Sequence, residues 1–320
     1  MRRLALTNPA SSLSGATDVL AGYCLAAPAL PRVGDTLFVL PLLFSSAVLL
    51  RAAGAVFEVC FGVAAGRTDP ARAARHTVAV SVYFADGRFS LKAAFMAGAA
   101  LAMLGLFAAL GAGAFVGKLP AYVAAFLFLA LWAKTGHGVA LPVLGPLASG
   151  VVRTLGLALG MSAHPDVVYL TNPTVAVAVA LYFAYGALLE VLDHAEGEGG
   201  KRYSLIGSVF GLVAVFAAAA ALLMRTPLSY IISVVGVTFI LSRAWSATST
   251  LLPANIRRLA EGAAMAAGFL AAALCFGNAS WRTTGGILPI GSAALLLVLV
   301  MGVLAERHGR EIADTARRPT

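Results

Sequence analysis

The segment FSSAVLLRAAGAVFEVCFGVAAGRTDPARAAR, residues 44–75, joins an apolar helix that carries two ionisable side chains to a basic segment directly after it. Arg51 and Glu58 lie seven positions apart, so a helix places them on nearly the same face. Their separation along the axis is about 10 Å, which is too long for a direct ion pair. We therefore expect each to need its own partner. Ionisable residues inside a membrane usually mark a functional site, and a polar pair satisfied by neighbouring helices is the structural alternative.

The composition indicates a polytopic helical membrane protein. Of the 320 residues, 60% are hydrophobic and only 12% are charged. Apolar runs of membrane-spanning length recur along the whole chain. The sequence lacks the alternating apolar and polar residues of barrel strands, which argues against an outer-membrane barrel. Three cysteines, at positions 24, 60 and 275, have no metal-ligand spacing and imply no disulfide framework.

The apolar runs predict an all-α bundle of nine to ten transmembrane helices in one membrane domain, residues 1–320. Within it, residues 1–9 are predicted to be an N-terminal cytoplasmic segment, 10–305 the helical bundle and 306–320 a polar tail. The predicted helices cover roughly 10–29, 36–65, 90–114, 118–134, 141–162, 168–192, 203–224, 227–248, 255–276 and 285–305. The count stays at nine or ten because only Arg225-Thr226-Pro227 separates the seventh helix from the eighth.

The distribution of Lys and Arg predicts that both termini are cytoplasmic and that the protein lies in the cytoplasmic (inner) membrane. With ten crossings, the outside loops keep only four basic residues, namely Arg32, Lys118, Arg225 and Arg282. The other loops and tails are rich in arginine. The net charge of +9 is thus a topology signal and does not indicate nucleic-acid binding.

This topology places two charged segments on the same side of the membrane. The loop after the second helix is basic, and the segment that ends the sixth helix contains Glu190, Asp193 and Glu196. On a helix these three carboxylates spread over about a third of the circumference. Such carboxylates can share Mg²⁺ with substrate phosphates, while nearby arginines and lysines hold the phosphate oxygens. A solvated, charged helix end is the alternative interpretation.

Four segments resemble the UbiA-type membrane prenyltransferases, and the resemblance covers most of residues 7–205. They are Asn8-Pro9 with DVLAGYCLA (18–26), LLRAAGAVFEV (49–59), DGRFSLKAAFMAG (86–98) and PVLGPLASGVVRTLGLALGMS (142–162). The last is the most specific and is similar to a divergent branch of UbiA-like proteins. The resemblance implies a UbiA-like helical bundle with two acidic motifs, after the second and sixth helices.

The first of these motifs departs from the family pattern Asn-x-x-x-Asp-x-x-x-Asp. Aligned through Ala53-Gly54, Glu58 stands at the Asn position, and Gly62 and Gly66 stand at the two Asp positions. The second motif is better kept, because Glu196 matches its last acid and two further acids precede it. The resemblance therefore implies Mg²⁺, if the protein is catalytic, with these metal ligands: Glu58, Glu190, Asp193 and Glu196.

The family also places basic residues close to the diphosphate. Lys134 and Arg153 stand at such positions, and Arg67 and Lys201 lie on the same predicted side of the membrane. These four residues are the predicted diphosphate-binding set. No catalytic residue is assigned.

Three functions stay open at this point. The first is transfer of an isoprenyl group from a prenyl diphosphate to a lipophilic or aromatic acceptor. The second is a non-catalytic protein that binds an isoprenoid or pigment, or that packs as a subunit against other membrane proteins. The third is a transporter of a lipid-like or anionic solute, although the two halves of the chain show no convincing internal repeat. The implied partners are an isoprenoid lipid and other membrane proteins, with no nucleic acid.

Overall fold

The computed structural model describes residues 9–26, 35–64, 90–136, 144–164, 172–197, 202–251, 253–277 and 287–316. These residues form ten α-helices and a π-helical turn, Asp35–Val39, that leads directly into the second of them. The described part of the chain contains no strand, which confirms the all-α prediction. The helices are α1 (Pro9–Ala26), α2 (Leu40–Ala64), α4 (Leu91–Val116), α5 (Leu119–Gly136), α6 (Leu144–Met161), α7 (Pro173–Gly197), α8 (Arg202–Leu223), α9 (Pro227–Thr250), α10 (Pro253–Gly277) and α11 (Ile287–Ala316).

Seven of these helices are long and apolar enough to cross a membrane. Two further apolar stretches, Leu119–Thr135 and Ile290–Ala305, are shorter. The predicted class of integral membrane protein is therefore confirmed.

Helix α4 shows how the bundle is adapted to lipid. Its buried residues are all alanine or glycine, namely Ala94, Gly98, Ala102, Gly105, Ala109 and Ala112. Large side chains such as Met103, Phe107 and Phe115 are more than half exposed. A water-soluble helix has the opposite distribution. Small residues inside a membrane bundle let helix backbones approach closely, and the large apolar side chains face the lipid.

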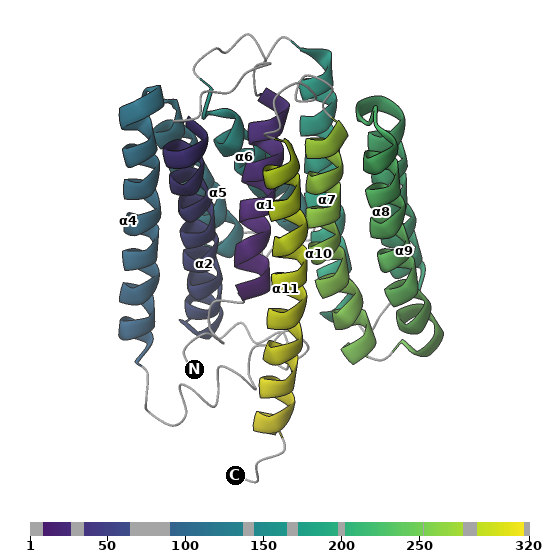
Figure 1. Cartoon of the computed structure of the whole chain (residues 1–320). Coiled ribbons are helices and arrows are strands. Elements are labelled where there is room, and N and C mark those ends of the chain that lie inside the picture. Colours follow the sequence, from purple (N-terminus) through teal and green to yellow (C-terminus); the bar gives the residue numbers. More distant parts are fainter. Residues whose placement is uncertain are drawn as a thin grey trace.

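Helix α1 lies in the middle of the bundle, with α4 and the α8–α9 pair at the two outer edges (Figure 1). It packs against α2, α6, α10 and α11. Its small and polar residues fit this position, since Ser12, Ser14, Thr17 and Asp18 are all buried. A buried polar helix face in a membrane protein requires partners on neighbouring helices.

Two glycines let α1 and α6 cross at backbone contact. A Cβ atom added at Gly22 would overlap the carbonyl oxygen of Leu157, and one at Gly160 would overlap that of Val19. Neither position can hold a side chain without moving a helix. The close crossing fixes the relative position of the two helices that carry Asp18 and Arg153.

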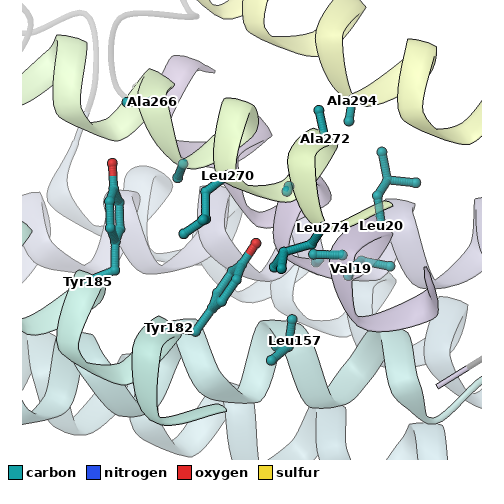
Figure 2. Close-up of a cluster of buried hydrophobic side chains, with 14 of the residues drawn as sticks. Val19, Leu20, Leu157, Tyr182, Tyr185, Ala266, Leu270, Ala272, Leu274 and Ala294 are labelled. Atoms are coloured by element: carbon teal, nitrogen blue, oxygen red, sulfur yellow. The ribbon is translucent and has the colours of Figure 1, made fainter. Parts of the chain in front are cut away.

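The apolar core extends through the bundle, and Figure 2 shows the part of it where α1, α6, α7 and α10 meet. Tyr182 and Tyr185 of α7 are 1% exposed and reach towards α10. The Tyr185 hydroxyl donates a hydrogen bond to the backbone carbonyl of Ala263. This bond joins α7 to α10 within the core.

The structure decides the boundary between α8 and α9, which the sequence left open, and it moves the predicted end of α11. α8 and α9 are separate helices, because the Thr226 hydroxyl caps the start of α9 and Pro227 follows it at the first helical position. The described chain thus has ten helices and not nine. At the other end, α11 continues to Ala316, whereas the apolar run predicts an end near residue 305. Its last turns are polar, so hydropathy alone misses them.

Candidate functional site

Three helices bring a carboxylate and two guanidinium groups together in the middle of the bundle. Arg51 Nη2 of α2 donates to Asp18 Oδ2 at 2.6 Å, and Arg153 Nη1 of α6 donates to Asp18 Oδ1 at 2.8 Å. The Asp18 side chain is fully buried. We call these residues the central triad. Breaking a buried ion pair is strongly destabilising, because the remaining charge is left without compensation.

Glycines surround the central triad and make room for it. A Cβ at Gly15 would come within 2.7 Å of Arg51 Cδ, and one at Gly186 within 2.8 Å of Arg153 Cγ. A Cβ at Gly156 would lie 3.1 Å from Asp18 Cβ. Helices α1, α6 and α7 thus each place a glycine next to a side chain of the central triad, where a larger residue would be too close.

Arg153 also contacts the aromatic ring of Tyr185, whose centroid lies 5.7 Å from the guanidinium carbon. A cation over an aromatic face is stabilised by the ring quadrupole, and more so away from water. Arg153 therefore connects α6 to both α1 and α7. Whether it also binds a diphosphate stays a prediction, because its described partners lie within the protein.

We expect Arg153→Lys to lower the stability of the bundle by about 1–2 kcal/mol. Lysine keeps the charge but loses the planar fork that holds Asp18 while facing Tyr185. The measurement is thermal unfolding in detergent, together with prenyl diphosphate binding per folded molecule. If Arg153 serves the triad alone, binding per folded molecule stays unchanged. A loss of binding at full stability would instead assign Arg153 to the ligand.

A second group of charged residues lies near one end of the bundle, which we call the loop face. It is the end at which α1 begins and α2, α5 and α7 end (Figure 1). Here Lys134 Nζ of α5 lies 2.7 Å from Glu190 Oε2 of α7. The side chains are 24% and 11% exposed, so the pair is only partly accessible. Lys134, which was predicted to bind the diphosphate, and Glu190, which was predicted to bind a metal, therefore form an ion pair with each other.

Glu58 lies on α2 at a depth similar to that of Lys134. Gly54 of α2 packs against Leu131 of α5, where a Cβ would come within 3.1 Å of Leu131 Cδ2. Both helices run towards the loop face. Glu58 lies about one turn after Gly54 on α2, and Lys134 lies about one turn after Leu131 on α5, so the two charged residues reach a similar depth. The Phe57 ring lies 5.1 Å from the ring of Trp132, which supports this register. Glu58 is half-buried and has no ion pair among the described side chains.

Aromatic rings pack together between α2, α4 and α5 beside Glu58. The cluster comprises Phe57, Phe61, Phe95, Phe128 and Trp132. Ring centroids in it are 5.1 to 6.5 Å apart, the usual range for tilted and edge-to-face pairs. This cluster packs α2, α4 and α5 together at the depth of Glu58.

Four predicted site residues lie wholly or in part outside the described residues. Arg67 and Lys201 lie outside the described residues, and so do the side chains of Asp193 and Glu196, whose backbone belongs to α7. Among the side chains that the structure does describe, no three His, Cys, Asp or Glu residues lie close enough to hold a metal. The predicted four-carboxylate metal site thus stays a prediction.

Asp18 is the residue that the sequence interpretation overlooked. It appears there only as the first residue of the segment DVLAGYCLA (18–26), although Arg51 was expected to need a partner. One signal could have identified it. Asp18 is the only acid in the segment of α1, and Arg51 and Arg153 are the only bases in those of α2 and α6. Charges of opposite sign on membrane helices commonly pair with one another.

Solved structures with the same fold come from UbiA-type enzymes and homologues. One is described as digeranylgeranylglyceryl phosphate synthase in membranes, with TM-score 0.55 and 15% identity over 87% of this chain and 97% of that one. A UbiA homologue from Archaeoglobus fulgidus gives TM-score 0.52 and 14% identity over 86% and 99%. The same homologue bound to DMAPP and Mg²⁺ gives TM-score 0.51 and 13% identity over the same shares. No protein-family profile and no curated protein sequence matches the chain.

The helical bundle, its lipid-facing surface and its buried charges define a polytopic membrane protein of the all-α class. The structural neighbours narrow this class. The chain has the UbiA-like membrane prenyltransferase fold, as the sequence motifs predicted.

Proposed function

We propose that this protein binds an isoprenoid lipid, with a prenyl diphosphate as the model ligand, and that its diphosphate lies at the loop face. The observation that carries the proposal is the meeting of Lys134 and Glu190 at the end of the bundle where α2 presents Glu58. A protein with this fold has been solved with DMAPP and Mg²⁺ bound. Both the fold and the position of these charges support a ligand that is apolar along its length and anionic at one end.

The described carboxylates do not fit a Mg²⁺ site of the kind that the family resemblance implies. Glu190 is bonded to Lys134, and α2 offers Glu58 but no second acid, since glycine stands at position 62. Mg²⁺ at such sites is usually held by one or two carboxylates together with substrate phosphates and waters, and here Glu58 is the single described carboxylate of this region that is not already paired with a lysine. We therefore propose binding as the main activity.

Lys134 can bind the ligand without any metal. Its ammonium is a compact cation with three donors, and it is a quarter exposed. An arriving diphosphate would compete with Glu190 for this ammonium. Binding then exchanges an internal ion pair for one with the ligand, so Glu190→Gln is expected to tighten metal-free diphosphate binding.

Prenyl transfer is the second candidate, and the acidic end of α7 favours it. Glu190, Asp193 and Glu196 follow one another at intervals of three on this helix. In the sequence, Asp193 and Glu196 are two further acids of the kind that the α2 motif lacks.

The deciding experiment uses purified protein, labelled prenyl diphosphates of several lengths, and Mg²⁺ present or absent. Binding and consumption of the labelled diphosphate are scored separately. We expect saturable binding with little turnover in the presence of lipophilic phenols. Rapid Mg²⁺-dependent turnover would establish the transferase instead, and the lack of any binding would remove both functions.

We further infer that the loop face is cytoplasmic and that the protein lies in the inner membrane. The excess of Lys and Arg in segments on this side supports the orientation. Accessibility of single cysteines introduced at residues 70 and 280, on opposite predicted sides, would test it.

We expect Glu58→Gln to leave the fold intact, because the size is kept and a half-buried charge is removed. If Glu58 helps to hold a cation beside the diphosphate, Mg²⁺-dependent binding weakens about tenfold, or 1.4 kcal/mol. Equilibrium binding with and without Mg²⁺ provides the measurement. A destabilised variant with unchanged binding per folded molecule would show that Glu58 is structural.

A further inference from the structure

The lipid-facing side of α9 changes from aliphatic to polar near Leu241. The exposed side chains before this point include Ile231, Val234 and Leu241 itself. After it the sequence of the helix is SRAWSATST (242–250), in which Trp245 is 80% exposed. Tryptophan and polar side chains on a lipid-facing surface are typical of the membrane–water interface. The last turns of α9 therefore lie at the level of the lipid headgroups.

The junction of α9 with α10 brings two arginines to this level. α9 ends and α10 begins at the loop face (Figure 1), where Asn255 Nδ2 donates to Thr250 Oγ1 at 2.7 Å. Deeper in the pair, the stem of Arg243 packs against α10, since a Cβ at Gly262 would lie 3.2 Å from Arg243 Cγ. Arg258 lies one turn before Gly262 on the same face of α10, so it emerges about 6 Å closer to the loop-face end. The two arginines thus belong to one stretch of the α9–α10 junction.

Both guanidinium groups are open at the surface. Arg258 is exposed, and Arg243 is half-buried beside the Phe239 ring, whose centroid lies 5.1 Å from the guanidinium carbon. The Arg243 guanidinium donates no hydrogen bond to a described residue, yet the one buried arginine nitrogen without a partner in that part of the chain is Arg51 Nε. The nitrogens of Arg243 are therefore not enclosed by protein. The ion pairs of the described side chains include neither Arg243 nor Arg258.

The local charge favours an anion as the missing partner. The described side chains of α9 and α10 carry two basic residues, Arg243 and Arg258, and one acid, Glu261. Basic residues at the ends of transmembrane helices attract anionic lipid headgroups. The planar guanidinium matches the oxygens of a phosphate and can hold it through two hydrogen bonds. Because the surface of α9 is aliphatic on one side of Arg243 and polar on the other, the ligand that fits has acyl chains and an anionic phosphate.

We propose that Arg243 and Arg258 form a binding site for the phosphate of an anionic phospholipid, whose acyl chains lie along the exposed aliphatic side of α9. Trp245 contacts the lipid where its headgroup meets its chains. The site is separate from Lys134, because α5 packs against α2, α4 and α6, whereas α9 packs against α8 and α10. The inference is therefore independent of the proposed function.

Quenching of Trp245 fluorescence by brominated lipids tests the site. The protein is reconstituted in phosphatidylcholine vesicles that contain a rising fraction of brominated phosphatidylglycerol or, in the matched series, of brominated phosphatidylcholine with the same chains. Trp245→Phe supplies the signal of the other tryptophans, which is subtracted. We expect half-maximal quenching of Trp245 at an at least about fivefold lower fraction of phosphatidylglycerol than of phosphatidylcholine. Such a difference measures recognition of the headgroup charge.

Removal of the two arginines should abolish this preference. In Arg243→Gln with Arg258→Gln, both brominated lipids are expected to quench alike. The control is Lys118→Gln with Arg225→Gln, which removes the same charge from exposed positions at the opposite end of the bundle and should keep the preference. If the double arginine variant does not fold, Arg258→Gln alone, at the exposed position, should lower the preference at least about twofold.

Four results would overturn the inference. They are equal quenching by the two lipids in the wild type, an arginine variant that keeps the wild-type preference, loss of the preference in the control variant, and displacement of the lipid by free glycerol phosphate. The last result would make the site one for a soluble phosphate. Prenyl diphosphate binding that depends on Lys134 should be the same in the arginine variants as in the wild type, so the proposed function succeeds or fails separately.

Discussion

Gly160→Ala is expected to disrupt the bundle, at a cost of about 3 kcal/mol or more. The new Cβ would overlap the Val19 carbonyl oxygen and lie 2.8 Å from the Tyr23 backbone nitrogen. Both are backbone atoms of α1, so no side chain can rotate away and the helices must separate. Separation of α1 from α6 would also pull Asp18 from Arg153. Thermal unfolding and size-exclusion profiles in detergent give the measurement.

Gly207→Ala is the matched control for this substitution. Gly207 lies in α8, and a Cβ added there would meet nothing within 4 Å. Alanine is the better helix former by about 1 kcal/mol, so this variant should be neutral or slightly stabilised. Equal stability of the two alanine variants would show that α1 and α6 do not cross at backbone contact.

The helices could be predicted well because the apolar length of each one is determined by its own residues and does not depend on its neighbours in space. Apolar length located all ten helices, nine of them to within five residues at both ends, and the motif at 142–162 pointed to the UbiA-like fold. The end of α11 was missed for the same reason. A helix can continue beyond the membrane through polar residues such as Arg310 and Asp314, where hydropathy carries no signal.

The pairing of charges could not be predicted, because it depends on how each helix is rotated and at what depth it packs. The spacing of Arg51 and Glu58 correctly excluded a direct pair, but it could not say that Arg51 would find Asp18 on α1. Likewise, family resemblance assigned Lys134 to diphosphate and Glu190 to metal, whereas the structure pairs them. The contacts of helix faces across a bundle, and not the order of residues, decide such partners.

Restoring the acids of the first motif is the second change with a large expected effect. The triple variant Glu58→Asn, Gly62→Asp and Gly66→Asp rebuilds the acidic pattern of the family at the end of α2 and in the sequence that directly follows it. A prenyl diphosphate carries about three negative charges, and Mg²⁺ offsets them only where carboxylates hold the ion. We expect the variant to bind a prenyl diphosphate at least about tenfold more tightly with Mg²⁺ than without it. The wild type should show a smaller dependence on Mg²⁺.

The control for this variant is Gly62→Asn with Gly66→Asn, which adds side chains of the same shape without charge. If glycine at these positions serves close packing, both variants lose stability equally, and binding must be compared per folded molecule. A folded triple variant without Mg²⁺-dependent binding would mean that the acids of α7 do not face α2. The loop face would then be a site for an isoprenoid bound through Lys134 alone. Brisk turnover by the wild type would lead to the opposite conclusion, because the acids of α7 would then suffice for metal binding despite the glycines at positions 62 and 66.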